Sequence, residues 1–155
     1  GVNAKIARIS MTYGPGIGLK DERVLAHFLR QALYEKKIKM LDDGSKIRTF
    51  CYIADCVLML LYIMIYGRDF VYNVGGKDSI SIRKLAEEIC MLTGSTLSQE
   101  IPCKENMQNI KVSPKLVKLD ITKICAEFSL PPFKPFREGL ARTIEWNKAV
   151  NGLSG

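Results

Sequence analysis

The sequence predicts an α/β or mixed α+β chain, because short strand-like segments alternate with longer segments whose apolar side chains recur at the helical period. Hydrophobic residues make up 47% of the 155 residues and charged residues 25%, an ordinary globular balance that excludes a disordered chain. The longest apolar run, Cys56–Tyr66, has about half the length that a membrane-spanning helix needs. Gly1–Ser10 alternates like a strand rather than a signal peptide. We therefore expect a soluble protein of about one domain.

The N-terminal part predicts a strand, a glycine-rich loop and a helix. Ala4–Ile9 alternates like a short strand, and Ser10–Lys20 carries glycines that indicate a loop with unusual backbone dihedrals. From Lys20 or Asp21 to about Glu35, apolar side chains follow the 3.6-residue period. Strands are then expected at 38–41 and 47–52, with a turn at 42–45.

The following segment, 54–66, is apolar on nearly all sides, which is typical of a helix that is covered on both faces. A helix after it is expected to have Ser79 or Ser81 as its N-cap and Gly94 at its C-terminal end. The other expected elements are strands at 70–74 and 99–102, a helix at 121–128 capped by Asp120, and a last helix at 136–150.

The five cysteines indicate neither a disulfide framework nor a zinc site, because their number is odd and no two are spaced as C-x-x-C. We expect reduced, mostly buried thiols and a cytoplasmic protein. The one histidine, His27, has no second histidine with which to share a metal, so no metal site is predicted. The cysteines are Cys51, Cys56, Cys90, Cys103 and Cys125.

The charge balance is basic: 23 Lys and Arg against 16 Asp and Glu give a net charge of +7. The basic residues are dispersed, with no run of five like charges and no alternation with aromatic residues of the kind that binds single-stranded nucleic acid. We therefore expect no nucleic-acid partner and no membrane partner. An anionic small ligand, or simply a solvated basic face, fits the charge better.

Four stretches, in this order and spacing, resemble one family. Together they are similar to the C-terminal half of the extended short-chain dehydrogenase/reductases of the NAD-dependent epimerase/dehydratase family. The pattern is nearest to UDP-glucuronate decarboxylases, dTDP-glucose 4,6-dehydratases and UDP-glucose 4-epimerases. The stretches are RISMTYGP at 8–15, DGSKIRTFCYIAD at 43–55, YNVGG at 72–76 with SIRKLAE at 81–87, and EGLARTIEW at 138–146.

The resemblance implies the last strands of a partial Rossmann-type sheet joined to a small α/β substrate-binding domain. Residues 1–80 would hold the last Rossmann strands and helices interleaved with substrate-domain segments, 81–150 the substrate-binding domain, and 151–155 a tail. The family's N-terminal glycine motif and its Tyr-x-x-x-Lys pair have no match here. We therefore expect a C-terminal piece, whether engineered, proteolytic or a degenerate gene product, with no catalytic residues of its own.

The resemblance also implies binding residues. Arg48 matches the arginine that reaches the substrate diphosphate, for which a planar guanidinium is well suited, although a plain surface arginine is the alternative. Asp43 and Gly44 would supply the turn that positions it. Toward the cofactor, Thr12 would donate a hydroxyl near the nicotinamide. Arg23 would add positive charge at a helix start, or would be a solvated first-turn residue.

Several positions depart from the family pattern. Met11 stands where the family usually has an asparagine that contacts substrate, and Leu41 stands where an aromatic residue often lines the base pocket. A downstream family arginine has no clear counterpart, so Lys115 or Lys118 would replace it as a point charge. Asp55 follows the family pattern, but we interpret it as the N-cap of the apolar helix.

These residues favour the substrate-binding half of an NAD-dependent nucleotide-sugar dehydratase, decarboxylase or epimerase that takes a UDP- or dTDP-sugar. NAD would be the cofactor of the complete enzyme, and the native state would be a homo-oligomer. Exposed apolar surface and self-association are expected of the isolated piece. The alternative is a non-catalytic binding or structural remnant, since the replacements at Met11 and Leu41 weaken the site.

Overall fold

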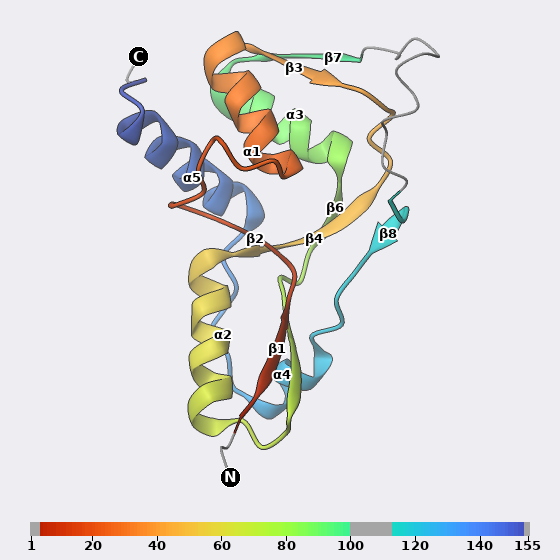
Figure 1. The fold of residues 1–155 in the computed structure, drawn as a ribbon, viewed down its shortest axis with the longest axis vertical. Helices are drawn as coiled ribbons and strands as arrows, with labels where there is room; N and C mark the ends of the chain where they lie inside the picture. The colour runs from red at the N-terminus through yellow and green to blue at the C-terminus, as the bar shows by residue number, and fades with distance from the viewer. Residues whose placement is uncertain (1–3, 100–112, 154–155) are drawn as a thin grey trace.

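The computed structural model, which describes residues 4–99 and 113–153, has two groups of elements joined by a central sheet (Figure 1). One end holds β1 (Ile6–Ile9), α2 (Ile53–Tyr66), β5 (Val71–Val74) and α4 (Thr122–Glu127). The other end holds α1 (Val24–Arg30), η1 (Gln31–Glu35), β3 (Lys37–Met40), α3 (Ile82–Thr93), β7 (Thr96–Gln99) and α5 (Phe136–Val150). Between them run β2 (Met11–Tyr13), β4 (Ile47–Tyr52), β6 (Ser79–Ser81) and β8 (Leu116–Val117).

The first group is a parallel strand pair covered by helices. β1 pairs with β5 from Ile6↔Val71 to Ile9↔Val74, and the two strands are separated along the chain by more than one helix, as parallel pairing requires. Their apolar core joins α2 to α4 through Met59, Tyr72 and Ile124, each at most 1% exposed. This group corresponds to the predicted partial Rossmann-type sheet.

The second group surrounds the larger core. β3 pairs in parallel with β7, and α1, α3 and α5 pack together through Leu29, Leu85 and Leu140, each fully buried. Helix α3 presents one apolar face to this core, as its 3.6-residue period predicts. The group combines elements from both predicted parts of the chain, since α1, η1 and β3 come from residues 1–80 and α3, β7 and α5 from residues 81–150.

The central sheet connects the two groups. β4 pairs in parallel with β2 and β8 and antiparallel with β6. Strand β2 lies inside the segment predicted as a loop, because Met11–Tyr13 finds a partner in Phe50–Tyr52 that is distant in sequence. Segments from four parts of the chain therefore meet at β4.

The first helix begins later than predicted. Asp21 N donates to the Gly18 carbonyl (3.0 Å), and Asp21 Oδ1 accepts from Arg23 N (2.8 Å), so Lys20 and Asp21 form a turn and α1 begins at Val24. A wider π-helical turn, η1, follows and ends at Lys36, which has φ 55°.

Two of the three predicted caps are present in the structure. Ser81 Oγ accepts from Lys84 N (3.1 Å) at the start of α3, and Gly94 ends this helix with φ 69°. Asp120 is not the N-cap of α4, because that position is Ile121; Asp120 Oδ1 accepts from Thr122 N (2.8 Å) in the turn before the helix. The strand predicted at 99–102 falls within the described residues only at Gln99, where β7 ends.

Helix α2 contradicts two expectations. It is not covered on both faces, since Met64 and Ile65 are 68% and 61% exposed. Asp55 is not its cap, because α2 begins at Ile53 and Asp55 Oδ2 accepts instead from Lys134 N (2.9 Å). A first-turn carboxylate still favours the positive end of the helix dipole, so Asp55 serves α2 and the 131–135 segment together.

Three further expectations concern the described residues alone. Cys51, Cys56, Cys90 and Cys125 form no disulfide with one another, while Cys103 lies outside the described residues. Within 4–99 and 113–153, no group of His, Cys, Asp and Glu is placed to hold a metal ion. No helix in these ranges has the length and hydropathy to cross a bilayer.

Candidate functional site

A pocket of about 430 Å³ opens where α1 and β3 approach the start of β4. This volume falls within the range of small-molecule sites. Three of the predicted substrate residues, Met11, Leu41 and Arg48, line it together. The other lining residues are Glu22, Val24, His27, Phe28, Lys39, Met40, Asp42, Lys46, Ile82 and Ser113.

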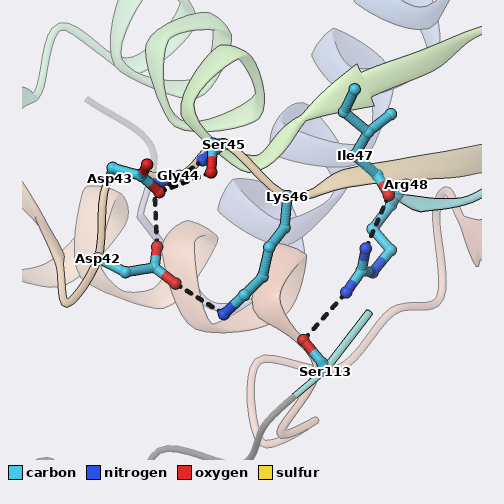
Figure 2. A network of polar contacts seen from close by, with 8 residues as sticks. All are labelled: Asp42, Asp43, Gly44, Ser45, Lys46, Ile47, Arg48 and Ser113. Atoms are coloured by element: carbon cyan, nitrogen blue, oxygen red, sulfur yellow. Dashed lines mark hydrogen bonds and ion pairs between the residues drawn. The ribbon is translucent and has the colours of Figure 1, made fainter. Parts of the chain in front are cut away.

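The β3–β4 turn forms one edge of this pocket (Figure 2). Asp42 Oδ1 accepts from Gly44 N (2.9 Å), and Asp43 Oδ1 accepts from Ser45 N (3.0 Å). Two bonds from Arg83 then tie the turn to α3: its N donates to the Gly44 carbonyl (2.9 Å), and its Nε donates to the Asp43 carbonyl (3.0 Å). The turn is therefore fixed to a helix before β4 begins.

Arg48 is held by neutral acceptors. Its Nη1 donates to the Ile47 carbonyl (2.7 Å) and its Nη2 to Ser113 Oγ (3.1 Å), as Figure 2 shows. No carboxylate in the described part of the chain forms an ion pair with it. The guanidinium therefore has a defined position and an uncompensated positive charge, as an anion-binding group requires.

The remaining charges of the pocket are partly neutralised. Lys46 Nζ forms an ion pair with Asp42 Oδ2 (2.8 Å), and this hydrogen bond is the main cause that lowers the Asp42 pKa. Burial, and then the nearby Arg30, lower the pKa of His27 below its usual value, so the imidazole is neutral at neutral pH.

The apolar wall lies beside these charges. Phe28 and Met40 are buried behind it, whereas Leu41 is 58% exposed at the pocket edge. Met11 completes the wall from β2. The pocket thus combines apolar area suited to a planar ring with a fixed cation suited to a phosphate.

The two predicted cofactor residues meet at another hollow. Thr12 and Arg23 both line a pocket of about 310 Å³ beside the 14–17 loop. Thr12 Oγ1 donates to the Ser10 carbonyl (3.3 Å). Arg23 Nε donates to Asp21 Oδ1 (3.0 Å), and the Arg23 side chain is the main reason that the Asp21 pKa falls to about 2. Arg23 is therefore exposed and already paired.

Comparison with known proteins supports this interpretation of the fold. Residues 1–75 match the model of the NAD dependent epimerase/dehydratase family. The chain is similar to this family over these residues. It is 33% identical over 140 residues to UDP-glucuronic acid decarboxylase 5 of Arabidopsis thaliana, covering 90% of this chain and 40% of that protein. It is 32% identical over 146 residues to UDP-glucuronic acid decarboxylase 1 of Xenopus tropicalis, covering 94% of this chain and 34% of that protein.

Solved structures with the same fold are also known. A dTDP-glucose 4,6-dehydratase from Bacillus anthracis in complex with NAD superposes with a TM-score of 0.78 at 23% identity, covering 95% of this chain and 45% of that one. A UDP-glucose 4-epimerase from Thermotoga maritima with UDP-glucose gives 0.78 at 24% identity, covering 95% and 46%. The predicted partial Rossmann-type α/β fold is thereby confirmed, and the chain spans less than half the length of these relatives.

Three of the six predicted substrate residues lie outside the 430 Å³ pocket. Asp43 and Gly44 do not line the 430 Å³ pocket but build the turn at its edge. Lys115 does not line it either: its carbonyl accepts from Ile47 N (2.8 Å) as β8 joins β4, and its side chain is exposed. The group that reaches Arg48 from this segment is Ser113.

Sequence reasoning missed four charged residues of the pocket, Glu22, Lys39, Asp42 and Lys46. Lys46 lies two residues before Arg48, and alternate residues of an extended chain point to the same side. The spacing of these two residues could therefore have indicated that Lys46 lines the same pocket. Asp42 was recognised only as a turn residue. Ser113 carried no local signal, because it reaches Arg48 across 65 positions of the chain.

Proposed function

We propose that this chain is the nucleotide-sugar-binding part of an NAD-dependent nucleotide-sugar dehydratase, decarboxylase or epimerase. The observation that carries the proposal is the uncompensated Arg48 guanidinium, which lies beside an apolar wall in one pocket. The relatives named as UDP-glucuronic acid decarboxylases, and the solved structure with UDP-glucose, support a nucleotide sugar as the ligand.

The residues have separate tasks in this proposal. The diphosphate of a UDP- or dTDP-sugar accepts hydrogen bonds from Arg48, whose fork can donate two at once. The pyrimidine ring lies near Phe28 and covers the exposed side of Leu41, so that the Leu41 side chain gains apolar contact area. Met11 contributes apolar surface but no donor, so orientation of the sugar depends on other groups.

The pocket lined by Thr12 and Arg23 is suited to form part of an NAD-binding site. Its open face carries a hydroxyl from Thr12 and backbone of Gly14 and Gly16, which allow close approach of a ligand. Arg23 would turn part of its fork from Asp21 toward the cofactor. NAD, when bound, supplies hydride transfer to and from the sugar, and this chain orients the substrate for it.

Catalysis by this chain alone is not part of the proposal. None of its six tyrosines has a lysine four residues later, so the acid/base pair of the family has no counterpart in the sequence. We propose that the complete protein is a cytoplasmic homo-oligomer. The exposed apolar side of α2 supports association with other protein surface.

The proposal is tested by calorimetric titration of the chain with UDP. Arg48→Ala removes a charged hydrogen-bond donor, so we expect at least about tenfold weaker binding, with Arg48→Lys intermediate. Arg142→Ala is the matched control, because Arg142 is an exposed arginine on α5 that pairs with Glu138 (2.9 Å), away from the pocket. Folded wild-type chain that gives no heat, or Arg48→Ala that binds UDP as wild type does, contradicts the proposal.

A second function is a non-catalytic binding or structural remnant of the family. The replacements at Met11 and Leu41 favour it, since both lie in the pocket and both remove a polar or aromatic contact. A folded chain that fails to bind UDP would support this alternative.

A further inference from the structure

Lys46 and Arg48 lie on the same side of the strand start. They are two residues apart where the chain enters β4, so their side chains extend in the same direction (Figure 2). Both line the 430 Å³ pocket. A ligand phosphate at Arg48 would therefore have a lysine ammonium as its neighbour.

The Lys46 ammonium already has an anionic partner. Asp42 Oδ2 lies 2.8 Å from its Nζ, while the other carboxylate oxygen of Asp42 accepts from Gly44 N. The Lys46 and Asp42 side chains are 28% and 40% exposed, so solvent screens their attraction and the pair contributes little to stability. Exchange of this partner for another anion is correspondingly easy.

We propose that Lys46 is a second cation for the ligand diphosphate and that Asp42 occupies its place until the ligand binds. The inference rests on the proposed function of the pocket and assigns a role to a lysine and a carboxylate in it. The diphosphate of a nucleotide sugar carries two negative charges against the single charge of a carboxylate, and its oxygens accept several charged hydrogen bonds. Asp42 then acts as an internal competitor that reduces affinity.

The other charged groups around the pocket are consistent with this role. Lys39 adds a second ammonium and hence a third cation, Glu22 adds one further carboxylate, and His27 is neutral at neutral pH. Asp42 is the only one of the two pocket carboxylates that forms an ion pair with a pocket lysine in the described residues. Its removal is therefore expected to change the charge that a diphosphate meets.

A purely structural role for the Asp42–Lys46 pair predicts the opposite sign. If the pair only held the turn, its loss would loosen Arg48 and weaken the binding of UDP. Asn at position 42 separates the two cases, because its side-chain oxygen can still accept from Gly44 N while the charge on Lys46 is released.

The experiment is calorimetric titration of UDP into the full chain and its variants at one salt concentration. We expect Asp42→Asn to bind UDP about threefold tighter, Lys46→Gln to bind it about tenfold weaker, and Lys46→Arg to retain most of the affinity. Asp69→Asn is the matched control, since Asp69 also pairs with a lysine (Lys123, 2.6 Å) but does not line the pocket. It should leave binding unchanged, which excludes an effect of net charge alone.

The outcomes separate this inference from the proposed function. Wild-type chain that is folded but does not bind UDP overturns the proposed function, and the role of Lys46 with it. UDP binding that requires Arg48 but is unchanged in Lys46→Gln, or weakened in Asp42→Asn, overturns only the inference. Urea unfolding of each variant shows whether a change in affinity follows from a change in stability.

Discussion

Substitution of Gly44 by alanine tests the packing of the turn that supports the candidate site. Gly44 has φ 67°, a left-handed conformation that costs an L-residue about 1–2 kcal/mol. An added Cβ would also contact the Met40 Cε methyl and would lie 2.7 Å from Arg83 N. The methionine methyl can move, but Arg83 N is backbone of α3 and bonds to the Gly44 carbonyl (2.9 Å).

The expected cost follows from these two effects. Displacing the turn from α3 adds an overpacking cost of about 1–3 kcal/mol to the backbone strain. We therefore expect Gly44→Ala to lower the free energy of unfolding by about 2–5 kcal/mol. Since the same turn carries Asp42 and precedes Arg48, the variant should also bind UDP more weakly than wild type under conditions where it is folded.

Gly94 offers a matched control. It has nearly the same backbone conformation, φ 69°, but nothing lies within 4 Å of an added Cβ. Gly94→Ala should therefore show the backbone strain alone, about 1–2 kcal/mol. Urea unfolding monitored by circular dichroism compares the two variants. Equal losses of stability in the two variants would refute the argument that contact with α3 fixes the Gly44 turn.

Two further predictions concern acid stability and association. Asp21 has a pKa of about 2, below its usual 3.8, so its contribution to stability is present above about pH 4 and is lost as the pH falls toward 2. In Asp21→Asn the free energy of unfolding should therefore fall less steeply over this pH range. A pH profile that the substitution leaves unchanged would contradict the pairing of Asp21 with Arg23. Met64 is 68% exposed on the apolar side of α2, so Met64→Lys should reduce self-association in light scattering, whereas the control Met91→Lys on α3 should not. A wild-type chain that stays monomeric at high concentration would count against this second prediction.

Local patterns were sufficient where one segment determines its own structure. Helix α5 spans Phe136–Val150 as its periodicity predicts, with Leu140 and Ile144 in the core. The turn at 42–45 follows from aspartates that bond to nearby backbone and a glycine that accepts a positive φ. In both cases the interactions that fix the backbone lie within a few residues.

Sequence patterns did not predict structure that depends on contact with a segment distant in the sequence. Strand β2 exists because Phe50–Tyr52 pairs with it, and a glycine-rich sequence gives no indication of that partner. Asp55 has the position of a helix cap but binds Lys134 N, 79 residues away. Exposure of α2 could not be inferred from its composition either, since an apolar segment does not reveal which side finds cover.

The same distinction holds within the candidate site. The resemblance to the family singled out Arg48, and Lys46 lies two residues before it, on the same side of an extended chain. The acceptor that orients the Arg48 guanidinium is Ser113, which comes from a segment that lies beside β4 only in the folded chain. Met11 and Leu41 were named for what they lack, and the structure places both at the pocket wall.

The geometry of the pocket makes ligand affinity depend on segments that never contact the ligand. Arg83 on α3 holds the backbone of the turn, and Asp42 at the same turn holds the Lys46 ammonium beside Arg48. A shift of α3 relative to β4 would therefore move the turn and the Lys46 ammonium relative to Arg48, and the proposed binding of a diphosphate to both cations would in turn hold the turn against α3. Ligand affinity and the stability of this turn thus depend on the same contacts. We therefore expect UDP to raise the free energy of unfolding of the wild-type chain more than that of Gly44→Ala.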